Sequence, residues 1–315
     1  MIKNKETFMF VSDSKNIACI GECMIEISHQ SNKFDFVKLG FGGDTLNTAI
    51  YLSRLLSATK NDVGFVTLLG SDPYAKNMLD TWQAEGINCD FVEHLEGRET
   101  GLYSIHLDAV GERVFYYWRS QAPARELFEG DIGAKRIERL YEKDVLYFSG
   151  ITLAVLYREG RKRLLKLAQY FKSEGKAVIF DTNYRPRLWQ GEDAEYFNRA
   201  AMESSTMLLP SLEDITGIFG NDQVDWREFL ESLQIPEIVF KQGGKPLLIF
   251  HDGGWIEQHL DKIQKPIDTT AAGDSFNAGY IAARLQGKTP VHASLLAHNL
   301  ACEVISYPGA IIPKQ

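Results

Sequence analysis

The segment 268–279 has the residue types of an anion-binding helix start. It reads Asp-Thr-Thr-Ala-Ala-Gly-Asp-Ser-Phe-Asn-Ala-Gly, so capping residues precede three residues with little or no side chain, and a helical pattern follows. The unpaired N–H groups of Ala271, Ala272 and Gly273, together with the helix dipole, would hold a phosphate-like charge. Asp274 stands where a bound polyphosphate would repel it, which favours a role in taking a proton from an attacking hydroxyl. This combination predicts phosphoryl transfer.

An ordinary helix cap is the alternative interpretation of this segment. Asp and Thr are common capping residues, and a Gly-Asp pair before an apolar run is often only a well-formed helix start. The residues alone leave both interpretations open.

A second motif whose residues could bind a ligand is Gly-Phe-Gly-Gly-Asp-Thr-Leu-Asn at 40–47. It lies directly before an amphipathic helix that we expect over 48–56. A glycine pair at a helix entrance lets a ligand approach the backbone, and Asp44 and Asn47 can hydrogen-bond sugar hydroxyls. A plain turn with an N-cap is again the alternative. Thr45 occupies the last position of a G-x-G-x-x-G pattern, which argues against a dinucleotide-binding fold.

The elements that must position these motifs alternate between strand and helix. Buried strands are expected at 17–22, 63–69, 87–92, 145–148, 177–180, 206–209, 237–241 and 247–250, and further helices at 74–85, 158–174 and 292–306. This alternation with short connections predicts an α/β fold whose mostly parallel sheet carries helices on both faces. Ligands in such sheets bind beyond the carboxyl ends of strands, which makes Asn183 and Arg185 candidates for a site.

An aromatic hairpin interrupts this pattern. Its arms, 101–107 and 113–119, flank a polar connection that contains glycine. A hairpin that projects from the sheet is a natural lid, and a lid excludes water from phosphoryl transfer. The period of two places Tyr117 and Arg119 on one face and Trp118 on the other. A dimer contact or simple packing is the alternative for the aromatic residues.

Size and composition limit the remaining choices. A chain of 315 residues with 44% hydrophobic residues suits one large α/β domain or two modest ones. The net charge of −8 argues against nucleic acid as a partner. The four cysteines lack metal-type spacing and predict reduced thiols in the cytoplasm, and no apolar run approaches the roughly 20 residues that span a membrane. The polar segment 1–16 predicts a flexible extension and not a signal peptide.

Six motifs together resemble the ribokinase (PfkB) family of sugar kinases, and within it the branch that phosphorylates the sugar acid 2-keto-3-deoxygluconate. The motifs are Gly-Glu-Cys-Met-Ile-Glu (21–26), Phe-Gly-Gly-Asp-Thr-Leu-Asn (41–47), Gly-Leu-Tyr (101–103), Gly-Glu-Arg-Val-Phe-Tyr-Tyr-Trp-Arg (111–119), Asn-Tyr-Arg-Pro-Arg-Leu-Trp (183–189) and Asp-Thr-Thr-Ala-Ala-Gly-Asp-Ser-Phe (268–276). They occur in order over almost the whole chain. Ala271 stands where most of the family has Gly, and alanine is expected there in this branch.

The resemblance implies a ribokinase-like three-layer α/β/α fold. A single kinase domain is expected over 17–315, with a small β lid formed by about 24–40 and 98–122. The implied reaction transfers the γ-phosphate of ATP to the C6 hydroxyl of the sugar acid, with Asp274 as the catalytic base and 271–273 as the anion hole. ATP and Mg²⁺ are the implied cofactors, a monovalent cation is left open, and a homo-oligomer is the expected assembly.

The same resemblance implies the contacts to both substrates. The substrate-binding residues are Gly43, Asp44, Asn47, Tyr103, Tyr117, Arg119, Arg185 and Asp274. The nucleotide-binding residues are Asn183, Arg185, Lys241, Gly243, Gly244, Ala272, Gly273 and Asn299. Arg119 and Arg185 are the candidates for the sugar-acid carboxylate, because a guanidinium pairs with a carboxylate through two hydrogen bonds.

Two questions stay open after the resemblance. Most of the family has Asn-x-x-Glu at a segment that organises magnesium, and this chain has Ser211, Glu213 and Asp214 there, so Asp214 is the candidate metal ligand. Another sugar kinase of the fructokinase or ribokinase type, or a sugar sensor without turnover on the same fold, is the alternative function.

Overall fold

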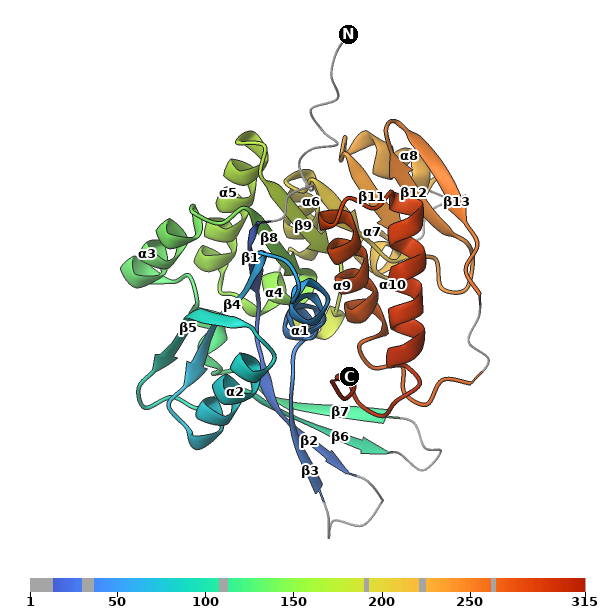
Figure 1. Cartoon of the computed structure of the whole chain (residues 1–315). Coiled ribbons are helices and arrows are strands. Elements are labelled where there is room, and N and C mark those ends of the chain that lie inside the picture. The colour runs from blue at the N-terminus through green and yellow to red at the C-terminus, as the bar shows by residue number, and fades with distance from the viewer. Residues whose placement is uncertain are drawn as a thin grey trace.

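The computed structural model describes residues 14–29, 37–107, 113–189, 193–220, 225–261 and 265–314 (Figure 1). Most of the extension predicted at 1–16 and the connection at 108–112 lie outside these residues. The first strand, β1, begins at Asn16, which pairs with Asp62, one residue before the predicted start of the kinase domain at 17. Among the described helices, none has the length and apolar character that a membrane crossing needs.

The central sheet has nine strands and is parallel over most of its width. Its order is β13 (Gly254–Gln258), β12 (Leu247–His251), β11 (Glu237–Phe240), β10 (Met207–Leu209), β9 (Ala177–Asp181), β8 (Val145–Ser149), β1 (Asn16–Ile20), β4 (Asp62–Gly70) and β5 (Asn88–Leu95). Neighbouring strands pair in parallel from β5 through β11, and only β12 and β13 at one edge are antiparallel. The predicted mostly parallel sheet is therefore confirmed.

Helices cover both faces of this sheet. One face packs against α1 (Asp44–Leu56), α2 (Pro73–Ala84), α9 (Ala272–Leu285) and α10 (Pro290–Val304). The other packs against α3 (Gly130–Leu140), α4 (Gly150–Val155), α5 (Arg158–Ser173), α6 (Ala194–Glu203), α7 (Leu212–Phe219) and α8 (Trp226–Ser232). In β1 the side chains alternate between the two cores, with Ile17 and Cys19 in the first and Ala18 and Ile20 in the second. This is the predicted three-layer α/β/α arrangement.

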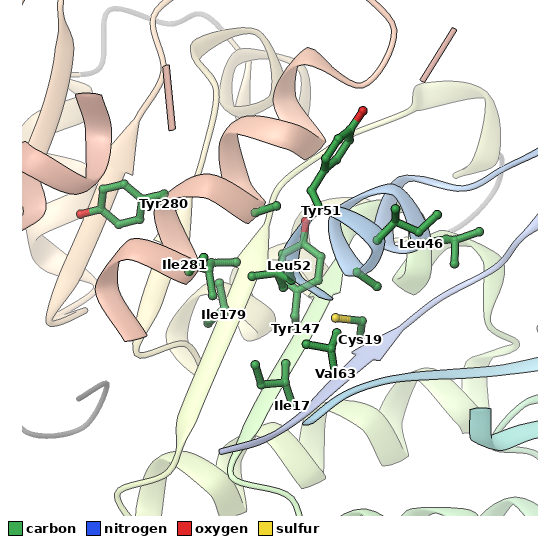
Figure 2. Packing of buried hydrophobic residues seen from close by; sticks show 14 of the residues in the cluster. Ile17, Cys19, Leu46, Tyr51, Leu52, Val63, Tyr147, Ile179, Tyr280 and Ile281 are labelled. Atoms are coloured by element: carbon green, nitrogen blue, oxygen red, sulfur yellow. The ribbon is translucent and has the colours of Figure 1, made fainter. Parts of the chain in front are cut away.

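Helices α1 and α9 pack against each other over the middle of the sheet. Figure 2 shows Leu52 of α1 and Ile281 of α9 with Tyr147 of β8 and Ile179 of β9 in one buried cluster. Both helices begin at the motifs that the sequence singled out, so their packing brings these two motifs together. Helix α1 starts at Asp44, four residues before the predicted start at Thr48, because Gly43 takes the extended N-cap conformation and Asp44 fits the first turn.

A second, four-stranded sheet projects from the first. Its order is β3 (Val37–Gly42), β2 (Met24–His29), β6 (Leu102–Leu107) and β7 (Arg113–Trp118), and β6 and β7 form the predicted hairpin (Figure 1). Tyr103 lies opposite Tyr117, and Leu102 lies opposite Trp118. The two faces predicted from the period of two are therefore present, and we refer to this four-stranded sheet as the lid.

Candidate active site

The topology of the central sheet has a switch point between β1 and β8. From β1 the chain continues to β4 and β5 on one side, whereas β8, β9 and β10 extend to the other side. Ligands of open α/β sheets bind at such a switch point, outside the carboxyl ends of the strands. Asp44 of the motif 40–47 lies there, and its Oδ2 accepts hydrogen bonds from Ser149 Oγ at 2.5 Å and from Asn183 Nδ2 at 2.9 Å. Oδ1 of Asp44 accepts no bond from a described residue and so remains for a ligand hydroxyl.

Asn183 reaches Asp44 from a strained backbone conformation. Its φ of 24° lies in the left-handed region, which costs a residue with a side chain of order 1 kcal/mol or more. The residue follows β9 and its side chain is buried. Such strain is typical of functional sites. The resemblance assigns Asn183 to the nucleotide, whereas the structure joins it to Asp44, a residue of the predicted sugar site.

Asp274 lies in the first turn of α9 and is hydrogen-bonded to residues of α1 in and beside the motif 40–47. Asn47 Nδ2 donates to Asp274 Oδ2 at 2.8 Å, and Thr48 Oγ1 donates to the carbonyl oxygen of Asp274 at 3.2 Å. Asn47 and Asp274 are 227 positions apart in the chain. The structure thus brings the predicted sugar-binding motif and the predicted catalytic base into one site.

The electrostatic environment of Asp274 favours its protonated form. Burial raises the pKa of the Asp274 carboxyl well above its ordinary value, and the charges of Asp44 and Asp181 raise it further. The hydrogen bond from Asn47 and the charge of Lys241 act in the opposite direction. A carboxylate with a raised pKa is a stronger base, as proton abstraction from an alcohol requires.

The residues before Asp274 form an open helix N-terminus. Ala271 is the N-cap and has a φ of 59°, in the left-handed region where most of the family has glycine. Within the described residues, the N–H groups of Ala271, Gly273 and Asp274 have no acceptor, whereas Ala272 N–H donates to the carbonyl oxygen of Thr269 at 3.2 Å. The free N–H groups and the helix dipole suit an anion. Of the three residues predicted for the anion hole, Ala272 therefore has its N–H already engaged.

A buried polar network lies beneath this helix start. Lys241, just after β11, donates to Asp181 Oδ1 at 3.3 Å and to Asn277 Oδ1 at 3.1 Å. Asn277 Nδ2 in turn donates to the Tyr147 hydroxyl at 3.3 Å. Burial raises the pKa of Asp181 to about 6, against the opposing charge of Lys241. The network holds the Lys241 ammonium near the first turn of α9.

Sequence reasoning missed several members of this site. No role was predicted from the sequence for four of them: Ser149, Asp181, Tyr147 and Asn277. Ser149 and Asp181 end strands, and Asn277 lies within the motif 268–279. Ser149 ends β8 and Asp181 ends β9, and the strand-end rule that selected Asn183 applies equally to both. Tyr147 points into the core from the middle of β8, and no signal in the sequence distinguishes it from a packing residue (Figure 2).

Asp214 has a different environment from the one predicted for a metal ligand. Its Oδ2 accepts from Thr182 Oγ1 at 2.8 Å and from Ser211 Oγ at 2.6 Å, and its Oδ1 accepts from the N–H of Tyr184 at 2.8 Å. Among the described residues, no group of three His, Cys, Asp or Glu side chains is placed to hold a metal ion. The Asp214 carboxylate thus ties α7 to the segment after β9, and its predicted role as a metal ligand stays a prediction.

The lid contributes the predicted tyrosines and Arg119. The Tyr103 hydroxyl donates to Glu26, and the Tyr103 ring stacks on Tyr117 with centroids 6.0 Å apart. Arg119 lies beside the Tyr117 ring, with its Cζ 5.8 Å from the centroid, and forms a buried ion pair with Glu22. These side chains share the lid face that carries the Tyr103–Tyr117 pair.

Gly43 has a steric role at the junction of lid and sheet. A Cβ at this position would come within 2.1 Å of the Glu22 carbonyl oxygen, so only glycine lets α1 begin this close to the segment after β1. The predicted direct contact between Gly43 and substrate stays a prediction.

The remaining candidates lie toward the surface. Arg185 has a side chain that is 57% exposed, donates to the carbonyl of Tyr184 at 2.9 Å and lies 4.0 Å from Asp214. Gly243 and Gly244 form an exposed turn after β11, with φ values of 57° and 83°. Asn299 is exposed on α10. The structure joins none of these residues to the Asp44–Asp274 centre by a described hydrogen bond.

Comparisons with known proteins agree with this geometry. The model of the pfkB family of carbohydrate kinases matches residues 14–315. The chain is 41% identical over 307 residues to a 2-dehydro-3-deoxygluconokinase of Escherichia coli K12, which covers 96% of this chain and 98% of the relative. It is also 41% identical over 309 residues to the protein of that name from Dickeya dadantii, with the same two coverages.

Solved structures show the same fold. A 2-dehydro-3-deoxygluconokinase of Thermotoga maritima superposes with a TM-score of 0.80 at 22% identity and covers 95% of this chain and 96% of its own. A fructokinase of Xylella fastidiosa with bound ATP has a TM-score of 0.80 at 20% identity and covers 94% and 93%. The family match, the sequence relatives and the shared fold together establish that this chain is a member of the pfkB family of carbohydrate kinases.

Proposed function

We propose that this chain transfers the γ-phosphoryl group of ATP to the C6 hydroxyl of 2-dehydro-3-deoxygluconate, which is also called 2-keto-3-deoxygluconate. The sequence relatives at 41% identity carry the name of that activity. The observation that supports it most directly is the position of Asp274, bonded to Asn47 at an open helix N-terminus. A base beside free N–H groups suits the attack of an alcohol on a phosphoryl group.

In this reaction Asp274 accepts the proton of the C6 hydroxyl. A bond forms between the C6 oxygen and the γ-phosphorus, and the bond from that phosphorus to the β,γ-bridging oxygen breaks, so that ADP leaves. The N–H groups of Ala271 and Gly273 offset the negative charge on the transferring oxygens. A Mg²⁺ ion bound with the nucleotide would supply further positive charge to the phosphate oxygens.

Asp44 and Asn47 orient the sugar hydroxyls, and the lid recognises the acid. The free Oδ1 of Asp44 accepts from a hydroxyl, and Arg119 lies on the lid face that carries Tyr103 and Tyr117. A guanidinium held in such a position pairs with a carboxylate and has no partner in a neutral sugar. Arg185, more exposed, is the second candidate for this carboxylate.

Lys241 and the exposed turn at Gly243 and Gly244 are the proposed contacts to the nucleotide phosphates. Lys241 Nζ is held by Asp181 and Asn277 close to the start of α9, which supports a position beside the phosphates. Asn299 on the exposed side of α10 is the proposed contact to the nucleotide base.

A substrate panel tests this function. With ATP and Mg²⁺, ADP release should be fast with 2-keto-3-deoxygluconate. With fructose or ribose, kcat/KM should be at least about 100-fold lower, because these sugars have no carboxylate for the free donors of Arg119. Faster turnover of fructose or ribose would favour the alternative of a fructokinase-like or ribokinase-like enzyme. Absence of ADP release with every sugar, while the sugar acid still binds, would favour a sensor.

We also propose a homo-oligomer that uses the outer face of the lid. Val37, Leu39, Tyr116 and Trp118 are exposed on this face, which borders a groove of about 840 Å³ lined by Ile25, Ile27 and Leu102 among others. Apolar surface of this kind is typical of protein interfaces. Light scattering of the purified chain tests the proposal, and a monomer at micromolar concentration would contradict it.

A further inference from the structure

We propose that Glu22 is a positioning residue for sugar-acid recognition: it holds one nitrogen of the Arg119 guanidinium and thereby directs the remaining donors to the substrate carboxylate. This inference rests on the proposed function, because it requires a sugar acid in the site.

The Glu22–Arg119 pair joins the two sheets at the edge of the site. Glu22 follows β1 of the central sheet, and Arg119 follows β7 of the lid. The two residues are 4% and 8% exposed. The backbone of Glu22 also contacts the start of α1, where Gly43 precedes Asp44, and Asp44 is close enough to raise the pKa of Glu22. The pair therefore stands between the lid and the sugar-binding motif.

Only part of the hydrogen-bonding capacity of this pair is used. Arg119 donates to Glu22 Oε2 through Nη2, and its Nε and Nη1 have no acceptor among the described residues. Oε1 of Glu22 is buried and likewise has no described partner. Burial raises the pKa of the Glu22 carboxyl, and the charge and hydrogen bond of Arg119 lower it. Nε and Nη1 of this otherwise buried arginine remain accessible, and accessible charged donors beside a substrate site suit an anionic ligand.

A second buried pair in the same chain shows what a purely structural arrangement looks like. Arg284 of α9 donates to Glu237 through both Nε and Nη2, at 2.9 Å each. Glu237 also accepts from the Tyr280 hydroxyl at 2.8 Å and lies 3.3 Å from His251 Nδ1. This pair is saturated by its neighbours, whereas the pair at the lid is not. A buried ion pair adds little net stability, so an unsaturated one at a site edge is better explained by recognition.

The geometry also directs the free donors. The Arg119 guanidinium lies beside the ring of Tyr117, which stacks on Tyr103, on one face of the lid. With one hydrogen of Nη2 held by Glu22, the planar guanidinium keeps one two-pronged edge, in which the second hydrogen of Nη2 acts together with Nη1 or with Nε. The hydrogen bond to Glu22 thus holds the guanidinium in place at the junction of the lid and the central sheet.

The test is Glu22→Gln, with Glu237→Gln as the matched control. Both changes remove one buried negative charge opposite an arginine and keep the side-chain shape. We expect Glu22→Gln to raise KM for the sugar acid by about tenfold or more, in the range of one charge-assisted hydrogen bond, with KM for ATP within twofold. Glu237→Gln should lower the melting temperature and leave both KM values within twofold.

A carboxamide analogue of the substrate separates recognition from a structural role. For this neutral analogue, wild type and Glu22→Gln should have equal KM values, because the interaction that Glu22 positions is absent. Should Glu22→Gln fold poorly, Glu22→Asp keeps the charge, shifts the carboxylate by one methylene, and should still raise KM for the acid selectively. Equal KM values for the acid in wild type and both variants would overturn the inference.

Failure of the proposed function is distinguishable in the same experiment. A wild-type chain that does not phosphorylate the sugar acid contradicts the function itself, whatever the variants do. A wild-type chain that turns over the acid, with variants that change only the melting temperature, contradicts the role of Glu22 alone.

Discussion

The central sheet and the lid differ in how deeply their side chains are buried. The inner strands of the central sheet are buried on both faces, and groups at their carboxyl ends are held by hydrogen bonds within the site. The lid is covered on neither face to the same degree, and Tyr116, Tyr117 and Trp118 are 51%, 49% and 61% exposed. This contrast suits the proposed division of roles, in which groups at the sheet edge carry out phosphoryl transfer and the lid contacts the sugar acid.

The two regions also differ in the charged groups that they bring together. Around Asp274, the carboxylates of Asp44 and Asp181 crowd together and raise its pKa. At the lid, one carboxylate faces one guanidinium. Changes in the sheet should therefore act on kcat and its pH dependence, and changes in the lid on KM for the sugar acid.

The largest effect is expected for Asp274→Asn. Loss of the general base should lower kcat by about 10²- to 10⁴-fold in a steady-state ADP-release assay. Because burial disfavours the ionised carboxylate in the folded state, the neutral amide should also raise the melting temperature, by about 2 °C for each 1 kcal/mol gained in a chain of this size. Near-normal kcat, or a lower melting temperature without loss of turnover, would contradict the role assigned to the sheet.

Arg119→Lys comes next and acts on the lid. Lysine keeps the charge beside Glu22 but lacks the planar guanidinium, so KM for the sugar acid should rise by about tenfold or more. KM for ATP should stay within twofold, as measured with each substrate in turn. Arg284→Lys in the remote pair is the control and should leave both KM values unchanged. An equal rise of both KM values in Arg119→Lys would contradict the proposal that the lid acts on the sugar acid alone.

Asp181→Asn should shift the acidic limb of the profile of kcat/KM against pH by a fraction of a pH unit. Asp181 raises the pKa of Asp274, so removing its charge lowers that pKa, and Lys241, freed from its partner, lowers it further. Since the base acts in its ionised form, the acidic limb of kcat/KM against pH should move to lower pH. A limb that stays in place or moves to higher pH would show that Asp181 does not act on the base.

The smallest effect is expected for Ala271→Gly. The left-handed conformation of Ala271 costs about 1 kcal/mol, which glycine avoids, while glycine adds about 0.4 to 1 kcal/mol of unfolded-state entropy. Calorimetry should therefore show a melting temperature within about 2 °C of wild type, with kcat within twofold. A tenfold loss of kcat would mean that the alanine methyl group contributes to the site.

Much of the fold was predictable because its signals are local. Strand periodicity located β1, β4, β8, β9 and β11, and the aromatic hairpin 101–119 was recognised from its alternation. The short helices α3, α4, α6, α7 and α8 and the edge strand β13 were not predicted, since their apolar patterns are brief and tertiary packing stabilises them. The start of α1 was placed one turn too late, because Asp44 was interpreted as a ligand contact and not also as a first-turn residue.

The sequence by itself determined which residues could carry the proposed chemistry: small residues and an aspartate at a helix start, a glycine pair before Asp44, and arginines at element ends. Only the tertiary structure decided which of them meet. Asn47 reaches Asp274 across 227 positions and Glu22 reaches Arg119 across 97, and local pattern contains no information about such contacts. The raised pKa of Asp274 has the same origin, because burial and the nearby carboxylates exist only once the sheet and its helices have packed.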